Sequence, residues 1–94
     1  MWIQTIDNTL VNADKIREIH LSYFGKDGRT AIECELDNYY EGSENWCLLG
    51  VYPTKEAAQY AFRKLGYAIG NWAKCKMGDG IVPILSPKDC EFVI

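Results

Sequence analysis

The sequence predicts an α+β fold, in which an antiparallel sheet of about five or six strands is packed by one long helix over residues 54–72 and ends in a short C-terminal edge strand. Two observations carry this prediction. Apolar residues recur with the period of two of a strand in several segments before Pro53, and with the period of 3.6 of a helix after it. Because 94 residues can bury one modest core, we expect residues 1–94 to form a single domain.

The first two strands are expected to form an N-terminal hairpin. MWIQTI alternates in strand fashion, and Asp7-Asn8 is a turn signal that leads into LVNA. Residues 15–24 then alternate as a longer strand. A regular alternation places Ile19 on one face of this strand and Ile16 on the other.

The glycine-bracketed turn GKDG leads to a second, clearer hairpin. In RTAIECELD the carboxylates face outward, and the inward face is predicted to carry Thr30, Ile32, Cys34 and Leu36. Residues 45–52, NWCLLGVY, are apolar on both faces, which predicts a central strand.

Pro53-Thr54 marks the start of the helix, where Thr54 can accept hydrogen bonds from the first-turn amides and Glu56 suits the helix dipole. The following apolar residues fall in one stripe: Ala58, Ala61, Phe62, Leu65, Ala68, Ile69 and Trp72. Since this stripe keeps its phase across Gly66, one continuous helix is favoured. A helix that stops at Gly66, followed by a second short one, stays open as an alternative.

The C-terminal residues supply the last strand. A basic connector, AKCKMGDG, is followed by apolar residues in IVPILS and CEFVI. Pro83 and Pro87 cannot donate to a sheet ladder, so an edge strand is expected here.

Charge and composition exclude several functions. The net charge of −3 divides into −5 over residues 1–54 and +2 over residues 55–94, so surfaces of opposite sign are expected, but not direct nucleic-acid binding. No apolar run is long enough for a membrane helix, and no signal peptide is recognised, so we expect a cytoplasmic protein without membrane association. The four cysteines lack zinc or redox spacing and are interpreted as small buried hydrophobes.

No motif for catalysis is found. The chain lacks a phosphate-binding loop, a nucleophile elbow and a zinc-protease motif, and His20 is its lone histidine. We therefore expect a protein that is not an enzyme and that uses no cofactor or metal. A small structural zinc protein is kept as a second alternative.

The outer face of the helix is the first candidate surface. Opposite the apolar stripe, a helical wheel places Tyr60, Arg63, Lys64, Tyr67, Asn71 and Lys74. Tyrosines offer rigid contact area and the bases offer charge, and Gly66 and Gly70 on the flank would let a partner approach. The alternative is that the C-terminal strands or the acidic loop cover these tyrosines and that the glycines admit those segments.

An acidic segment is the second candidate surface. Without any base among them, residues 33–44 include carboxylates and two adjacent aromatics: Glu33, Glu35, Asp37, Tyr39 and Tyr40. Alternating carboxylates can imitate a row of phosphates toward a partner, with the tyrosines as anchors. They can equally be the solvated face of a hairpin.

The order LVNADKI, VYPTKEAA and IVPILSPKD, after an initial Trp-Ile, resembles a group of short uncharacterised proteins of Firmicutes, their phages and mobile elements. The resemblance implies a small antiparallel sheet packed by one helix, similar to a pleckstrin-homology-type half barrel, and no catalytic residues. It favours a phage or mobile-element protein that binds and inhibits a host protein, such as a defence-system component, in the bacterial cytoplasm. The alternative function is a sponge for a small ligand or nucleotide signal, with Arg63, Lys64 and Lys74 on the phosphate.

Overall fold

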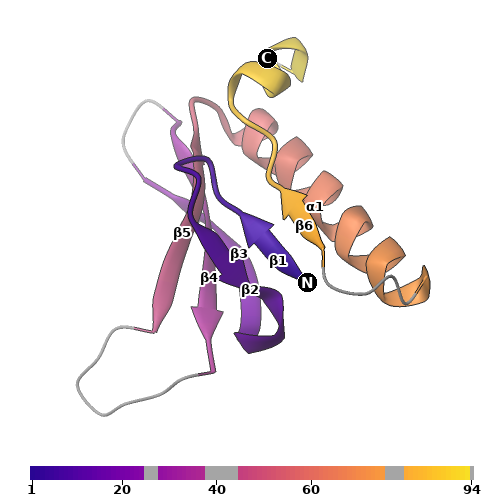
Figure 1. Cartoon of the computed structure of the whole chain (residues 1–94). Coiled ribbons are helices and arrows are strands. Elements are labelled where there is room, and N and C mark those ends of the chain that lie inside the picture. The colour runs from indigo at the N-terminus through magenta and orange to yellow at the C-terminus, as the bar shows by residue number, and fades with distance from the viewer. Residues whose placement is uncertain (25–27, 38–44, 76–79, 94) are drawn as a thin grey trace.

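Two three-stranded sheets and one long helix make up the fold (Figure 1). The computed structural model describes residues 1–24, 28–37, 45–75 and 80–93, without the side chains of 72–75 and 91–93. The α+β class and the packing of one helix on antiparallel strands are confirmed. The prediction of a single sheet of five or six strands is wrong, because the strands divide into two groups.

The smaller sheet joins the two ends of the chain. It has the order β2-β1-β6 and consists of β1 (Trp2–Gln4), β2 (Leu10–Asn12) and β6 (Ile81–Pro83). The strands β1 and β2 form the predicted N-terminal hairpin, whose turn holds Asn8 at a φ of 67°. The strand β6 pairs in parallel with β1, so the expected C-terminal edge strand exists but belongs to this sheet.

The larger sheet is fully antiparallel, in the order β3-β4-β5. Its strands are β3 (Ile16–Tyr23), β4 (Thr30–Leu36) and β5 (Trp46–Tyr52). The predicted hairpin of β3 and β4 is confirmed, but β4 rather than β5 is central. The apolar residues of β5 are not all covered, since Trp46 and Leu48 are exposed. The turn of the N-terminal hairpin reaches this strand, where the Ile6 amide donates to the Leu49 carbonyl over 3.1 Å.

A bulge near the start of β3 changes which residues face the core. Ile16 lies opposite Leu36 and Ile19 lies opposite Cys34, so Arg17 is an extra residue in the strand. The extra residue brings Ile16 and Ile19 to the same face, and both pack against the core. The prediction that they face opposite sides is therefore wrong.

A second bulge lies in β5 and places Gly50 opposite Ile32, with Leu49 as the extra residue. The ring of Tyr52 covers Gly50, where an added Cβ would lie 3.0 Å from ring atoms. The Tyr52 hydroxyl donates to the Leu85 carbonyl and ties the C-terminal segment to the sheet. The short helix η2 (Lys88–Val93) follows and packs beside α1.

The long helix α1 (Lys55–Cys75) packs across all three strands of the larger sheet and against β6. Thr54 caps it as predicted, because its Oγ1 accepts from the Ala57 amide over 3.1 Å. The helix continues through Gly66 and ends three residues later than predicted, so the two-helix alternative is wrong. Its apolar stripe closes a core formed with both sheets: Ile3, Ile32, Cys34, Leu49, Tyr52, Ala58, Ala61, Leu65 and Cys90.

Candidate functional site

The outer face of α1 exposes most of the side chains predicted for it. The core contacts of Ala57, Ala58, Ala61 and Leu65 fix the rotation of the helix and turn the opposite side toward solvent. On that side Tyr67 has 69% of its surface exposed, and three polar side chains are exposed with it: Arg63, Lys64 and Asn71. The side chain of Lys74 lies outside the described residues.

Tyr60 holds a different position from Tyr67, because it is half-buried and packs against the edge of the core. The Lys64 ammonium lies 5.5 Å from the centre of the Tyr60 ring, within the range of a cation–π contact. Together with Arg63 and Tyr67, these residues line a shallow depression of about 200 Å³. We call these four residues the helix ridge. Tyr60 is held against the core on one side of the ridge, whereas Tyr67 is exposed and can contact a partner.

The two helical glycines border open space. A Cβ atom added to Gly66 or Gly70 would meet no heavy atom within 4 Å. Among the described residues nothing therefore packs on them, and the described C-terminal residues 80–90 do not occupy the glycine flank. The acidic loop at 38–44 lies outside the described residues. The C-terminal helix η2 packs on α1 elsewhere, near the first turns of the helix (Figure 1).

The acidic surface predicted for residues 33–44 also contains a base, Arg17, which comes from the neighbouring strand β3. On β4, Glu35 accepts a hydrogen bond from Arg17 over 2.8 Å, and the pair is exposed at 37% and 68% of the respective side chains. Glu33 lies half-buried opposite His20, and Asp37 is exposed just after the strand. Tyr39 and Tyr40 lie outside the described residues.

The two candidate surfaces do not form one site. Glu33 and Glu35 alternate along β4 with Ile32 and Cys34, which are fully buried toward α1, so the carboxylates face away from the helix. The helix ridge points away from the sheet on the other side of the molecule. A single partner surface would have to wrap around the domain to contact both.

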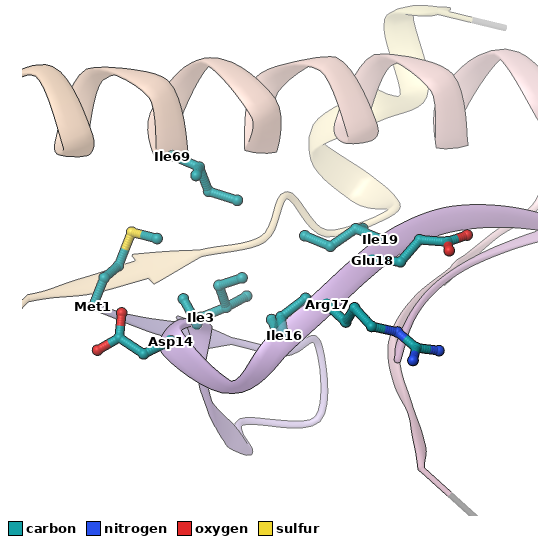
Figure 2. A pocket seen from close by; sticks show the side chains of 9 residues that line it. Met1, Ile3, Asp14, Ile16, Arg17, Glu18, Ile19 and Ile69 are labelled. Atoms are coloured by element: carbon teal, nitrogen blue, oxygen red, sulfur yellow. The ribbon is translucent and has the colours of Figure 1, made fainter. Parts of the chain in front are cut away.

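An apolar pocket lies between α1 and the start of β3 (Figure 2). It has a volume of about 480 Å³, within the range of small-molecule sites. Its wall is mainly apolar and is formed by Met1, Ile3, Ala13, Ile16, Ile19 and Ile69. We call it the isoleucine pocket. Ile69 points from the helix toward the strand in Figure 2, and Met1 lies beside it.

The isoleucine pocket does not follow from a regular alternation along β3. Without the bulge at Arg17, Ile16 would face away from Ile19 and Ile69 and could not line a shared wall. The one local signal was that Ile16 falls on an otherwise polar face of a regular strand, while Arg17 falls on the apolar one. A misplaced apolar residue next to a charged one is typical of a bulge, but it does not locate one.

Two thiols face each other across the larger sheet, since Cys34 lies directly opposite Cys47. Burial, with a smaller contribution from the neighbouring Cys47, raises the pKa of Cys34 from 9.0 to about 11. A thiol with so high a pKa is a poor nucleophile at neutral pH. Cys34 and Cys90 are fully buried, which confirms that they are core residues. In the described part of the chain, no three His, Cys, Asp or Glu side chains gather where they could hold a metal ion.

Comparisons with known proteins assign this chain to no group: no family model, no curated protein and no solved structure matches it. Among the described residues, no helix combines the length and the apolar character needed to cross a membrane.

Proposed function

We propose that this protein is a non-enzymatic binding protein that docks on an acidic surface of another protein through the helix ridge. In the bacterial and phage setting that the sequence resemblance implies, the partner is a host protein, which is inhibited by being occupied. The observation that carries the proposal is the 69% exposure of Tyr67 between two exposed bases. Tyrosine and arginine are both enriched among the residues that carry most of the binding energy of protein interfaces.

The charge of the ridge selects the kind of partner. Arg63 and Lys64 are both exposed, and none of the described carboxylates forms a salt bridge with either of them. A surface with two unneutralised cations favours an acidic counterpart, which also speeds the encounter of the two proteins. The open flank at Gly66 and Gly70 allows the backbone or ring of a partner to approach the helix closely.

A nucleotide is the less favoured ligand for this surface. The depression on the ridge has about 200 Å³, below the roughly 300 Å³ at which small-molecule sites begin. A nucleotide sponge would also need to enclose its base, whereas the ring of Tyr67 is open to solvent. Thermal denaturation with a nucleotide panel separates the two functions, since a ligand at 100 times its Kd adds about 2.7 kcal/mol of stability.

Site-specific photo-crosslinking tests the proposal directly. A benzophenone amino acid in place of Tyr67 is expected to form a discrete adduct with one acidic protein in a lysate of a Firmicutes host. The matched control carries the same probe at Trp46, which is also an exposed aromatic residue, at 50%, but lies on the larger sheet. Adducts of equal yield from both positions would indicate non-specific capture and refute the proposal, as would the absence of an adduct from position 67.

Reversing the charge of a ridge residue tests whether the partner is acidic. Arg63→Glu is expected to abolish the adduct at position 67, because it places a carboxylate against an acidic partner. Lys55→Glu is the control, since Lys55 is an exposed base on the same helix that is outside the ridge and lies 5.4 Å from the Tyr23 ring. If both substitutions weaken the adduct equally, the net charge of the protein and not the ridge determines binding.

A further inference from the structure

The strand β3 lies at the edge of the larger sheet, and among the described strands it pairs with β4 alone. The Phe24 amide donates to the Arg29 carbonyl, on the β4 side, over 3.1 Å. In an antiparallel ladder the backbone groups of alternate residues point to the same neighbour. The amides and carbonyls of Ser22 and His20 therefore face β4. The backbone groups that face away from β4, and form no hydrogen bond with the described chain, are those of Ile19, Leu21 and Tyr23.

This open part of β3 has none of the features that usually keep an edge strand from pairing with another chain. Such features include proline, lysine and bulges. The bulge of β3 is at Arg17, before the open part, and residues 19–24, IHLSYF, contain neither proline nor lysine. The other edges are less suited to pairing. The strands β2 and β6 have three residues each, and the Leu49 carbonyl of β5 already accepts from the Ile6 amide.

We propose that β3 pairs with β3 of a second copy of this chain, antiparallel and with Leu21 on the two-fold axis. In this register Leu21 faces Leu21 of the other copy, and Ile19 faces Tyr23 of the other copy. Every outward amide and carbonyl of these three residues then has a partner. A register centred on Ser22 would leave Ile19 beyond the end of the other strand, which is Tyr23.

The charges of β3 favour the same register. On the outer face of the sheet His20 would face Ser22 of the other copy, and Glu18 would face Phe24, so no two like charges are opposed. A register centred on His20 would instead set two imidazoles against each other. It would also pair Tyr23 with the bulged Arg17. The Leu21 register avoids both.

The side chain of Tyr23 has a place to pack in this dimer. It lies on the side of the sheet that carries the helix, since the ammonium of Lys55, at the start of α1, is 5.4 Å from the centre of its ring. Pairing sets Tyr23 of the other copy beside Ile19. There α1 and β3 leave a hollow that is also lined by Phe62 and Leu65. The ring can lie against this hollow and be removed from water.

The helices leave room for the second copy. Because α1 packs across all three strands of the larger sheet, it is centred over β4 and not over the open edge. The two helices of the dimer are then about three strand spacings apart, or roughly 14 Å. Helices in contact are 8–10 Å apart, so the pairing of the strands causes no clash between them.

The size of the interface predicts a reversible dimer. Tyr23 and Phe24 have 59% and 38% of their surface exposed, which for aromatic side chains amounts to roughly 200 Å² on each copy. The strand edge, about 20 Å long and 10 Å thick, adds a similar area. The total of about 800 Å² for both copies is at the low end of specific interfaces and typical of transient complexes. We therefore expect the dimer to form at high protein concentration and to dissociate on dilution.

Amide hydrogen exchange, measured by NMR in dilute and concentrated samples of the full chain, tests the pairing. The amides of Ile19, Leu21 and Tyr23 should exchange at least about threefold more slowly in the concentrated sample. Those of His20 and Ser22 should be equally slow in both, because they bond to β4. Unchanged exchange at the three outward amides would overturn the proposal, as would uniform slowing along β3.

Sedimentation velocity with a pair of variants tests the role of the open edge. The unmodified chain should convert from monomer to dimer with concentration and form nothing larger, because the pairing uses both edges. Leu21→Pro removes an amide that points away from β4 and should stay monomeric. Leu21→Ala loses the same side-chain contacts but keeps the amide, and it should still dimerise. Equal dimerisation of the two variants, or an unmodified chain that stays monomeric, refutes the pairing.

The tyrosine contact is tested by Tyr23→Ala, which should weaken the dimer by at least about tenfold. Tyr67→Ala is the matched control, because it removes an exposed tyrosine from the helix ridge and should leave the dimer unchanged. Weakening by Tyr67→Ala but not by Tyr23→Ala would place the contact on α1 and overturn the proposal. Both tyrosines are exposed, so this comparison decides the proposal even if Leu21→Pro fails to fold. Dimerisation is measured on the purified chain, so the result is independent of the proposed protein partner.

Discussion

Replacing glycine by alanine at four positions should give opposite effects on stability, and the signs follow from the geometry around each glycine. Gly66 and Gly70 are exposed, lie inside α1 and have nothing within 4 Å of an added Cβ. Alanine there reduces the conformational entropy of the unfolded chain and meets no obstacle in the folded one. Each substitution should raise the free energy of unfolding by about 1 kcal/mol.

Gly28 and Gly50 are the controls, because a side chain at either position would be strained or would clash. Gly28 has a φ of +86°, so Gly28→Ala is strained and should cost about 1 kcal/mol or more. At Gly50 an added Cβ would lie 3.0 Å from the Tyr52 ring, whose hydroxyl is held by the Leu85 carbonyl. The ring cannot withdraw without breaking this hydrogen bond, so Gly50→Ala should cost about 1–3 kcal/mol.

Urea denaturation followed by circular dichroism measures the free energy of unfolding of all four variants. An unchanged slope of this free energy against urea concentration shows that the substitution has not altered the unfolded state. In thermal scans 1 kcal/mol corresponds to about 4–8 °C for a domain of this size. A loss of stability in Gly66→Ala or Gly70→Ala would refute the reasoning, because it would mean that a segment of the chain packs on the glycine flank. Stabilisation by Gly50→Ala would contradict the packing of Tyr52.

Four further predictions use single sites. Tyr67→Ala should change the free energy of unfolding by less than about 0.5 kcal/mol in urea denaturation, because the ring is exposed; a larger loss would mean that the ring is covered. Thr54→Ala should lower it by about 1 kcal/mol through loss of the helix cap, and Thr54→Ser, which keeps the hydroxyl, should recover most of this. Tyr52→Phe should cost about 1 kcal/mol, since it removes the donor to a part-buried carbonyl; a neutral result would argue against this hydrogen bond. Burial raises the pKa of Cys34 from 9.0 to about 11, so its neutral thiol favours the folded state, and stability should fall as the pH rises from 9 to 11, less steeply in Cys34→Ala.

Local features of the fold were predictable from the sequence, because they depend on neighbouring residues. The Thr54 cap, the apolar stripe of α1 and its continuity through Gly66 all follow from spacing within one helix. The two hairpins follow from turn signals between alternating segments. Exposure of Tyr67 likewise follows from its angle on the helical wheel.

The division into two sheets was not predictable in the same way. Alternation along a strand shows which face is buried, but it does not show which strand is the neighbour. The pairing of β6 with β1 joins residues about 80 positions apart and depends on the path of the whole chain. The bulges at Arg17 and Leu49 each depend on a register that two strands settle together. The isoleucine pocket was missed for this reason, whereas the helix ridge, built on one helix, was found.

The helix ridge and the isoleucine pocket lie on different sides of α1. Tyr67 and Ile69 are two residues apart, which turns their side chains by about 200° around the helix axis. The Tyr67→Ala substitution should therefore weaken the binding of the protein partner, whereas Ala13→Leu, which adds bulk to the pocket wall, should leave it unchanged. If both substitutions weaken it in folded protein, the partner contacts both sides of the helix or the two sides are coupled through it, and the assignment of the partner to the helix ridge alone fails.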